Sequence, residues 1–162
     1  MGDIALQYWG EAKLTHTAPV TVLIPSSEGD AALEKIVSVF PPRIPDALKF
    51  ARQYRSCPIK TQDGWDIDIS LGISGYEKEV MQRTVDYDIG EGRIVKVCSA
   101  EDFIINKAIA GRPQDIADME TVVIRQGKAL NMNYIDSWLK DFSFLLEMDE
   151  TMERLKRLQI LK

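Results

Sequence analysis

Residues 57–71 read CPIKTQDGWDIDISL, and this stretch decides the fold class that we predict for the chain. Two β-rich runs flank Asp63-Gly64, a dipeptide that favours the tight turn of a β-hairpin. On the second run, Asp66 and Asp68 share one face, because successive residues of a strand point to opposite sides of a sheet. The stretch therefore predicts an antiparallel pair of strands with an acidic face.

Outward from this hairpin, helices and strands alternate up to residue 98, and only helices follow. We expect helices at 3–9, 30–40, 46–55 and 75–83, a strand at 20–24, and a second hairpin from strands at 85–89 and 93–98. Ser99, with Asp102 three residues later, predicts the start of a helix. Further helices are expected at 100–110, 113–126, 132–142 and 144–160. The pattern predicts an α/β (α+β) protein with a core at 1–98 and a packed helical segment at 99–162.

Composition narrows the classes of function. The 162 residues suit one domain, and the net charge of −5 disfavours broad binding to duplex nucleic acid, which needs a basic surface. Two separated cysteines, Cys57 and Cys98, and the lone His16 cannot form a Cys/His zinc site. We expect buried thiols and a histidine in a surface loop. No signal peptide or apolar run of about 18 residues is visible, so we expect a cytoplasmic protein without a membrane partner.

Two readings of the Asp66 and Asp68 pair are open from the pattern alone. Carboxylates on one strand face suit Mg²⁺, which takes oxygen ligands and keeps several waters. The other reading is a half-exposed strand with its acidic face in water.

Lys107, Asp115 and Asp118 form a second group. The two aspartates are spaced i, i+3 and share one helix face. The break at Gly111-Arg112-Pro113 can fold the preceding helix back and bring Lys107 towards that face. The group is then either a cation that contacts phosphate beside an orienting carboxylate, or an ordinary interhelical salt bridge.

In order along the chain, these motifs resemble the nucleotidyltransferase superfamily, with the bacterial AbiEii-type and minimal nucleotidyltransferases as the closest branch. GDIALQYWG at 2–10 resembles the segment where the family has Gly-Gly or Gly-Ser opening a helix. LTHTAPVTVLI at 14–24 resembles the family's Leu-Thr-x-Asp-x-Asp strand. DIDISLG at 66–72 resembles the strand with the third carboxylate, and residues 98–118 are similar to the helical lysine and aspartate motif.

The resemblance implies a mixed sheet flanked by helices and an Mg²⁺-dependent transfer of a nucleoside monophosphate to a hydroxyl of RNA, protein or a small molecule. A nucleoside triphosphate would be the donor. Several members are toxins of toxin–antitoxin pairs, so an antitoxin would be a partner. Carried over by position, the roles are catalysis for Asp68, Lys107 and Asp118, nucleotide binding for Gly2, Lys107 and Asp115, and metal binding for Asp66 and Asp68.

Three positions depart from the family. Thr17 and Pro19 stand where the two aspartates of Asp-x-Asp are expected, and Asp3 replaces the second Gly or Ser. Mg²⁺ would lose two of its three carboxylates, and a negative charge would lie near the triphosphate. We therefore expect a degenerate nucleotidyltransferase-like protein with residual nucleotide binding.

Two alternatives remain open. One is an active enzyme that uses Asp66, Asp68, Lys107 and Asp118. The other is a non-enzymatic oligomeric interaction module. The family's first strand also has no counterpart here, and we expect a second copy to cover the open sheet edge, as a homodimer.

Overall fold

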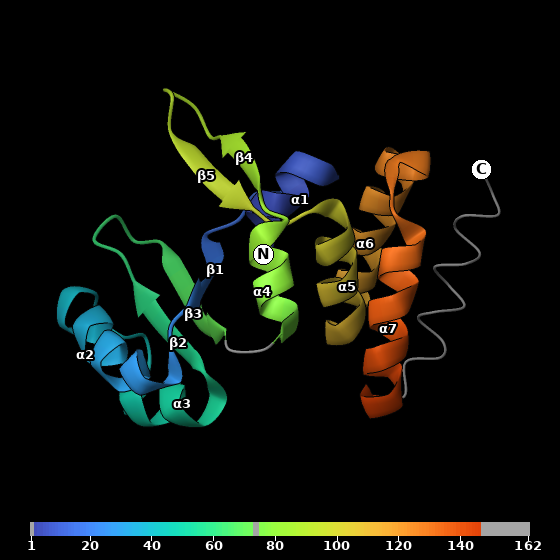
Figure 1. Cartoon of the computed structure of the whole chain (residues 1–162). Helices are drawn as coiled ribbons and strands as arrows, with labels where there is room; N and C mark the ends of the chain where they lie inside the picture. The colour runs from blue at the N-terminus through green and yellow to red at the C-terminus, as the bar shows by residue number, and fades with distance from the viewer. Residues whose placement is uncertain (1, 73–74, 147–162) are drawn as a thin grey trace. The chain divides into compact units, whose positions relative to one another are not determined.

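The computed structural model describes residues 2–72 and 75–146 and has a mixed α+β fold, which confirms the predicted fold class (Figure 1). The chain divides into two compact units. The first unit comprises Met1–Asp3 with Leu14–Arg83, and the second comprises Ile4–Lys13 with Thr84–Lys162. A division after residue 98 stays a prediction.

The first unit is built on a three-stranded sheet with the order β1-β3-β2. Its elements are β1 (Thr17–Leu23), a 3-10 turn (Ser26–Glu28), α2 (Gly29–Val39), α3 (Ala47–Tyr54), β2 (Ser56–Lys60), β3 (Asp66–Gly72) and α4 (Gly75–Gln82). The predicted first hairpin is confirmed, because β2 pairs antiparallel with β3.

Strand β1 lies parallel to β3 along its other side, from Thr17 opposite Asp66 to Leu23 opposite Gly72. It begins three residues before the predicted strand at 20–24. Pro19 therefore lies inside a strand, although it has no backbone N–H to donate. An edge strand tolerates proline, and among the described strands β1 is an edge.

One face of this sheet packs against helices and forms the core of the first unit. The buried residues come from α2, α3, β2 and β3: Leu33, Ala51, Cys57, Ile59, Ile69 and Leu71. Ile67 packs against the same cluster. The isoleucines and aspartates of β3 therefore take opposite faces, as the alternation predicted.

The second unit combines a hairpin with helices. It holds α1 (Asp3–Trp9) from Ile4 onward, the antiparallel pair β4 (Val85–Asp88) and β5 (Ile94–Val97), α5 (Ala100–Ala110), α6 (Pro113–Gln126), a 3-10 turn (Gly127–Ala129) and α7 (Met132–Leu146). Figure 1 shows α5, α6 and α7 side by side. The expected hairpin at 85–98 is confirmed.

Local signals explain where the helices of the second unit begin and end. Ser99 caps α5, and its Oγ accepts a hydrogen bond from the backbone N of Asp102 at 3.1 Å, as predicted. Gly111 ends α5 with a φ of 63°, a left-handed conformation that glycine adopts without strain. Pro113 then opens α6, where its missing N–H costs nothing.

Helix α7 differs from the prediction. A break was expected near residue 143, but α7 runs from Met132 to Leu146. No glycine or proline interrupts that stretch, so nothing stops the helix. Most of the helix predicted at 144–160 lies outside the described residues.

The N-terminal arm, which we define as Ile4–Lys13, is part of the second unit. Ala5 and Leu6 of the arm are buried, and Trp9 Nε1 donates to the Cys98 carbonyl at 2.7 Å. Gln126 Nε2 donates to the Trp9 carbonyl at 2.8 Å, and Arg125 donates to that of Gly10. The arm is thus held by both apolar packing and hydrogen bonds.

The core of the second unit is formed by buried side chains of α1, α5, α6 and α7. Its fully buried large side chains are Leu6, Phe103, Ile104, Ile105, Met119, Val122, Ile135 and Leu139. None of the helices in the described ranges is long and apolar enough to cross a membrane.

Candidate functional site

The acidic face of β3 carries Asp66 and Asp68, and both face the cation Arg43. Arg43 Nη1 lies 3.3 Å from Asp66 Oδ2, and Arg43 Nη2 binds Asp68 Oδ1. The side chains are partly exposed, at 27% for Arg43, 34% for Asp66 and 42% for Asp68. The two carboxylates were predicted from the sequence, whereas Arg43 was not.

The backbone fixes the position of Arg43. Lys60 N donates to the Pro41 carbonyl at 2.9 Å, and Arg43 N donates to the Pro58 carbonyl at 3.0 Å. Pro42 also forms a β-bridge with Ile59. The segment after α2 thus runs along the outer side of β2, and from there the Arg43 side chain reaches the acidic face of β3.

Two of the three positions that depart from the resembled family's pattern, Thr17 and Pro19, lie beside these carboxylates on the neighbouring strand. The register places Thr17 opposite Asp66 and Pro19 opposite Asp68. Gly2, with a φ of 134°, packs so closely on Pro19 that a Cβ there would lie 2.3 Å from Pro19 Cγ. Asp3 begins α1. Four of the residues that the resemblance singled out, namely Gly2, Thr17, Pro19 and Asp68, therefore lie together.

This donor set does not fit Mg²⁺. The ion needs several oxygen ligands, but the strand beside Asp66 and Asp68 offers a threonine and a proline, and an arginine already binds both carboxylates. Within the residues that the structure covers, no three His, Cys, Asp or Glu side chains form a group that could hold a metal ion.

Lys107, Asp115 and Asp118 form a buried ion cluster in the second unit. Lys107 Nζ donates to Asp115 Oδ1 at 2.8 Å and to Asp118 Oδ2 at 2.9 Å. Only 3% of each aspartate side chain and 15% of the lysine side chain are exposed. The predicted approach of Lys107 to the two aspartates across the Gly111 break is confirmed, while their functional roles stay predictions.

Three further polar side chains that the sequence pattern did not predict complete this cluster. Arg112 Nε donates to Asp115 Oδ2 at 2.6 Å, and Gln114 Nε2 donates to Asp118 Oδ1 at 2.7 Å. Lys13 from the N-terminal arm binds Asp118 as well. Arg112 and Gln114 adjoin the predicted motif and could have been inferred from helical spacing, but Lys13 is separated from Asp118 by 105 positions.

The cluster keeps its members charged. Burial opposes ionisation of Asp115 and Asp118, but hydrogen bonds from Arg112, Lys107, Lys13 and Gln114 outweigh it and leave the pKa of both carboxyls lowered. Burial likewise opposes the charge of Lys107, but hydrogen bonds to Asp115 and Asp118 outweigh it and leave the lysine pKa raised. Lys107 is thus an ammonium between two carboxylates at neutral pH.

The residues of the predicted site fall in both units. Gly2, Asp66 and Asp68 belong to the first unit, whereas Lys107, Asp115 and Asp118 belong to the second. The structure brings each set together within its own unit.

The remaining candidates do not form a nucleophilic site. His16 is exposed ahead of β1, as predicted, with its ring centroid 5.9 Å from that of Trp65. Cys57 and Cys98 are buried free thiols, also as predicted. Burial raises the pKa of Cys57 and raises that of Cys98 to about 11, so both thiols stay protonated at neutral pH.

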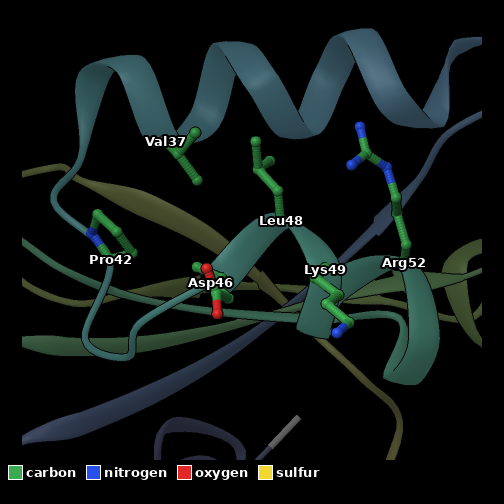
Figure 2. Close-up of a pocket in the computed structure, with 7 residues that line it drawn as sticks. Val37, Pro42, Asp46, Leu48, Lys49 and Arg52 are labelled. Atoms are coloured by element: carbon green, nitrogen blue, oxygen red, sulfur yellow. The ribbon is translucent and has the colours of Figure 1, made fainter.

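A cavity of about 450 Å³ lies beside α2 and α3, and it contains none of the predicted site residues (Figure 2). Figure 2 shows Leu48 and Arg52 pointing towards α2, whereas Asp46 and Lys49 point away from it. Arg52 is also bound to Asp30 at 2.8 Å. A small-molecule site needs convergent polar groups, and these diverge.

No protein-family model matches the chain, and no curated protein matches it.

Proposed function

We propose that this chain is a nucleotidyltransferase-like protein that has lost nucleotide transfer and keeps weak nucleotide binding centred on Lys107. The register of β1 against β3 carries the proposal. The three positions where the resemblance expects carboxylates are neighbours on two parallel strands, but they hold Thr17, Pro19 and Asp68. The close packing of Gly2 on Pro19 supports the same alignment, because the family's glycine turn precedes the Asp-x-Asp strand.

The Lys107 cluster supports residual binding. A lysine ammonium has three N–H donors, and Lys107 gives one each to Asp115 and Asp118. The third can donate to a phosphate oxygen, while the two carboxylates hold the nitrogen in place.

The loss of transfer is tested by incubating the full chain with each labelled nucleoside triphosphate, Mg²⁺ or Mn²⁺, and RNA or protein acceptors. We expect no incorporation. Incorporation that disappears in Asp68→Asn would overturn the proposal in favour of an active enzyme that uses Asp66, Asp68, Lys107 and Asp118.

Residual binding is tested separately by isothermal titration with ATP, GTP, CTP and UTP. We expect weak binding to the wild type and at least a tenfold loss of affinity in Lys107→Met. Arg52→Gln is the control, since it removes a paired cation that lies outside the predicted site. If the wild type gives no heat with any nucleotide, residual binding is wrong, whereas the loss of transfer stands.

We also propose a binding partner, namely a second copy of this chain. A homodimer through β1, an edge strand of the first sheet among the described strands, is tested by light scattering, and a monomer down to low micromolar concentration would contradict it. An antitoxin partner has no supporting contact among the described residues and stays a prediction from the resemblance.

A further inference from the structure

We propose that Arg43 is a built-in counter-ion that closes the acidic face of β3 to divalent cations. The inference rests on the proposed function in one respect: it takes Asp66 and Asp68 as the face where the resembled family would hold its metal.

The first step is the placement of the guanidinium. Its two terminal nitrogens reach two different carboxylates, with Nη1 at 3.3 Å from Asp66 Oδ2 and Nη2 against Asp68 Oδ1. The planar fork of an arginine suits such a bridge, because its N–H groups diverge in one plane. The backbone hydrogen bond from Arg43 N to Pro58 anchors the residue, so the bridge is built into the sheet.

The formal charges on the acidic face of β3 also cancel. Asp66 and Asp68 contribute two negative charges, and Arg43 contributes one positive charge. Lys60 Nζ lies 3.9 Å from Asp66 Oδ1 and contributes the second. The neighbouring residues on β1, Thr17 and Pro19, are neutral. A divalent cation would therefore meet a face whose charges already cancel.

Replacement of the Arg43 guanidinium by Mg²⁺ would be unfavourable. Mg²⁺ gives up its waters reluctantly and needs carboxylates that are free to bind it. Here it would have to displace a guanidinium from both carboxylates, in exchange for ligands from only two side chains. Asp66 Oδ1 is buried and accepts no hydrogen bond among the described residues, so water and Mg²⁺ do not reach it from the surface without a rearrangement of the side chain.

The test is Mn²⁺ binding to the full chain, measured by electron paramagnetic resonance. We expect no saturable binding to the wild type at millimolar Mn²⁺, and at least a tenfold gain in affinity in Arg43→Gln. The double variant Arg43→Gln/Asp68→Asn should lose that gain. Arg43→Lys, which keeps the charge, should bind no more Mn²⁺ than the wild type.

Arg52→Gln is the matched control, because Arg52 also bridges two carboxylates, those of Asp30 at 2.8 Å and Glu34 at 3.7 Å. It makes the same change of charge outside the acidic face and should not create saturable binding.

Two outcomes would overturn the proposal. One is a folded Arg43→Gln variant, verified by circular dichroism, that gains no Mn²⁺ affinity. The other needs no variant, namely Mn²⁺-induced broadening of the Asp66 and Asp68 amide signals of the wild type in NMR spectra. Neither experiment measures nucleotide transfer, which the incorporation assay tests by itself, so failure here is distinguishable from failure of the proposed function.

Discussion

The molecule has two clusters in which a cation binds two aspartates, and the clusters differ in how deeply they are buried. In the second unit, Lys107 holds Asp115 and Asp118, whose side chains are almost entirely buried. In the first unit, Arg43 holds Asp66 and Asp68 at a surface that water reaches. Both clusters place one cation between two aspartates. The difference is that water can solvate the carboxylates of the first cluster if the arginine is removed, whereas the aspartates of the second are almost closed to water and depend on the cations that bind them.

The largest effect is expected from Lys107→Met. Removing Lys107 leaves the buried Asp115 and Asp118 with only the more exposed Arg112 and Lys13 as counter-charges, so the free energy of unfolding should fall by about 3 kcal/mol. Urea unfolding of the full chain measures it. Arg52→Gln serves as the exposed control and should change little. A loss no larger than that of the control would show that the two clusters do not differ.

The second largest effect is expected from acid, which should reduce the stability that the buried cluster contributes. The pKa values of Asp115 and Asp118 lie below their ordinary value of 3.8 in the folded chain, because cations bind the charged forms. A lowered pKa gives stability that is present above about pH 4 and is lost as pH falls through the folded pKa. Urea midpoints at pH 6 and pH 3 measure the loss. Asp115→Asn/Asp118→Asn should reduce it, and an unchanged pH dependence in that variant would contradict the assignment.

The raised pKa of Lys107 predicts that the contribution of this residue to stability falls as the pH rises, which is opposite to the pH dependence of the two aspartates. Stability from this residue is present below its ordinary pKa of 10.5 and is lost as pH rises through the higher folded value. Lys107→Met should therefore lose less stability than the wild type between pH 9 and pH 12.

Lys13→Gln should have a smaller effect, of about 1 kcal/mol, because the lysine side chain is 40% exposed and Asp118 keeps Lys107 and Gln114. Chemical denaturation with Lys13→Arg as the conservative control measures it. An effect as large as that of Lys107→Met would mean that Lys13, rather than Lys107, is the main counter-charge of Asp118.

Arg43→Gln should have the smallest effect on stability, no more than about 1 kcal/mol. Sodium chloride at 1 M should remove most of this difference, since exposed charges are screened within about 3 Å at that ionic strength. The effect of Lys107→Met should persist in the same salt. Equal salt sensitivity of the two variants would contradict the difference in burial between the two clusters.

The two clusters also differ in how well they could be predicted from the sequence. The buried cluster is local, since Lys107 lies 8 and 11 positions from its aspartates across a break marked by Gly111 and Pro113. Helical spacing and a turn signal were enough to predict it. Both hairpins were predicted for the same reason, because Asp63-Gly64 and the turn at 90–92 are local signals.

Two of the partners that were not predicted, Arg43 and Lys13, come from distant segments. Arg43 lies 23 and 25 positions from its aspartates and reaches them only because the chain after α2 runs along β2. The parallel pairing of β1 with β3, which brings Pro19 beside Asp68, likewise depends on tertiary register. No local propensity encodes either contact, so a single sequence does not reveal them.

The division of the chain has a consequence for dissecting the protein. Because the N-terminal arm belongs to the second unit, residues 14–83 are an insertion within that unit's sequence. A fragment that starts at Thr84 would lack Leu6, which is fully buried, and the acceptor carbonyls of Trp9 and Gly10. Likewise, one protease cut after Arg83 would leave the two units joined through residues 13 and 14. The second unit can therefore be isolated only by fusing the arm directly to residue 84, with the insertion removed.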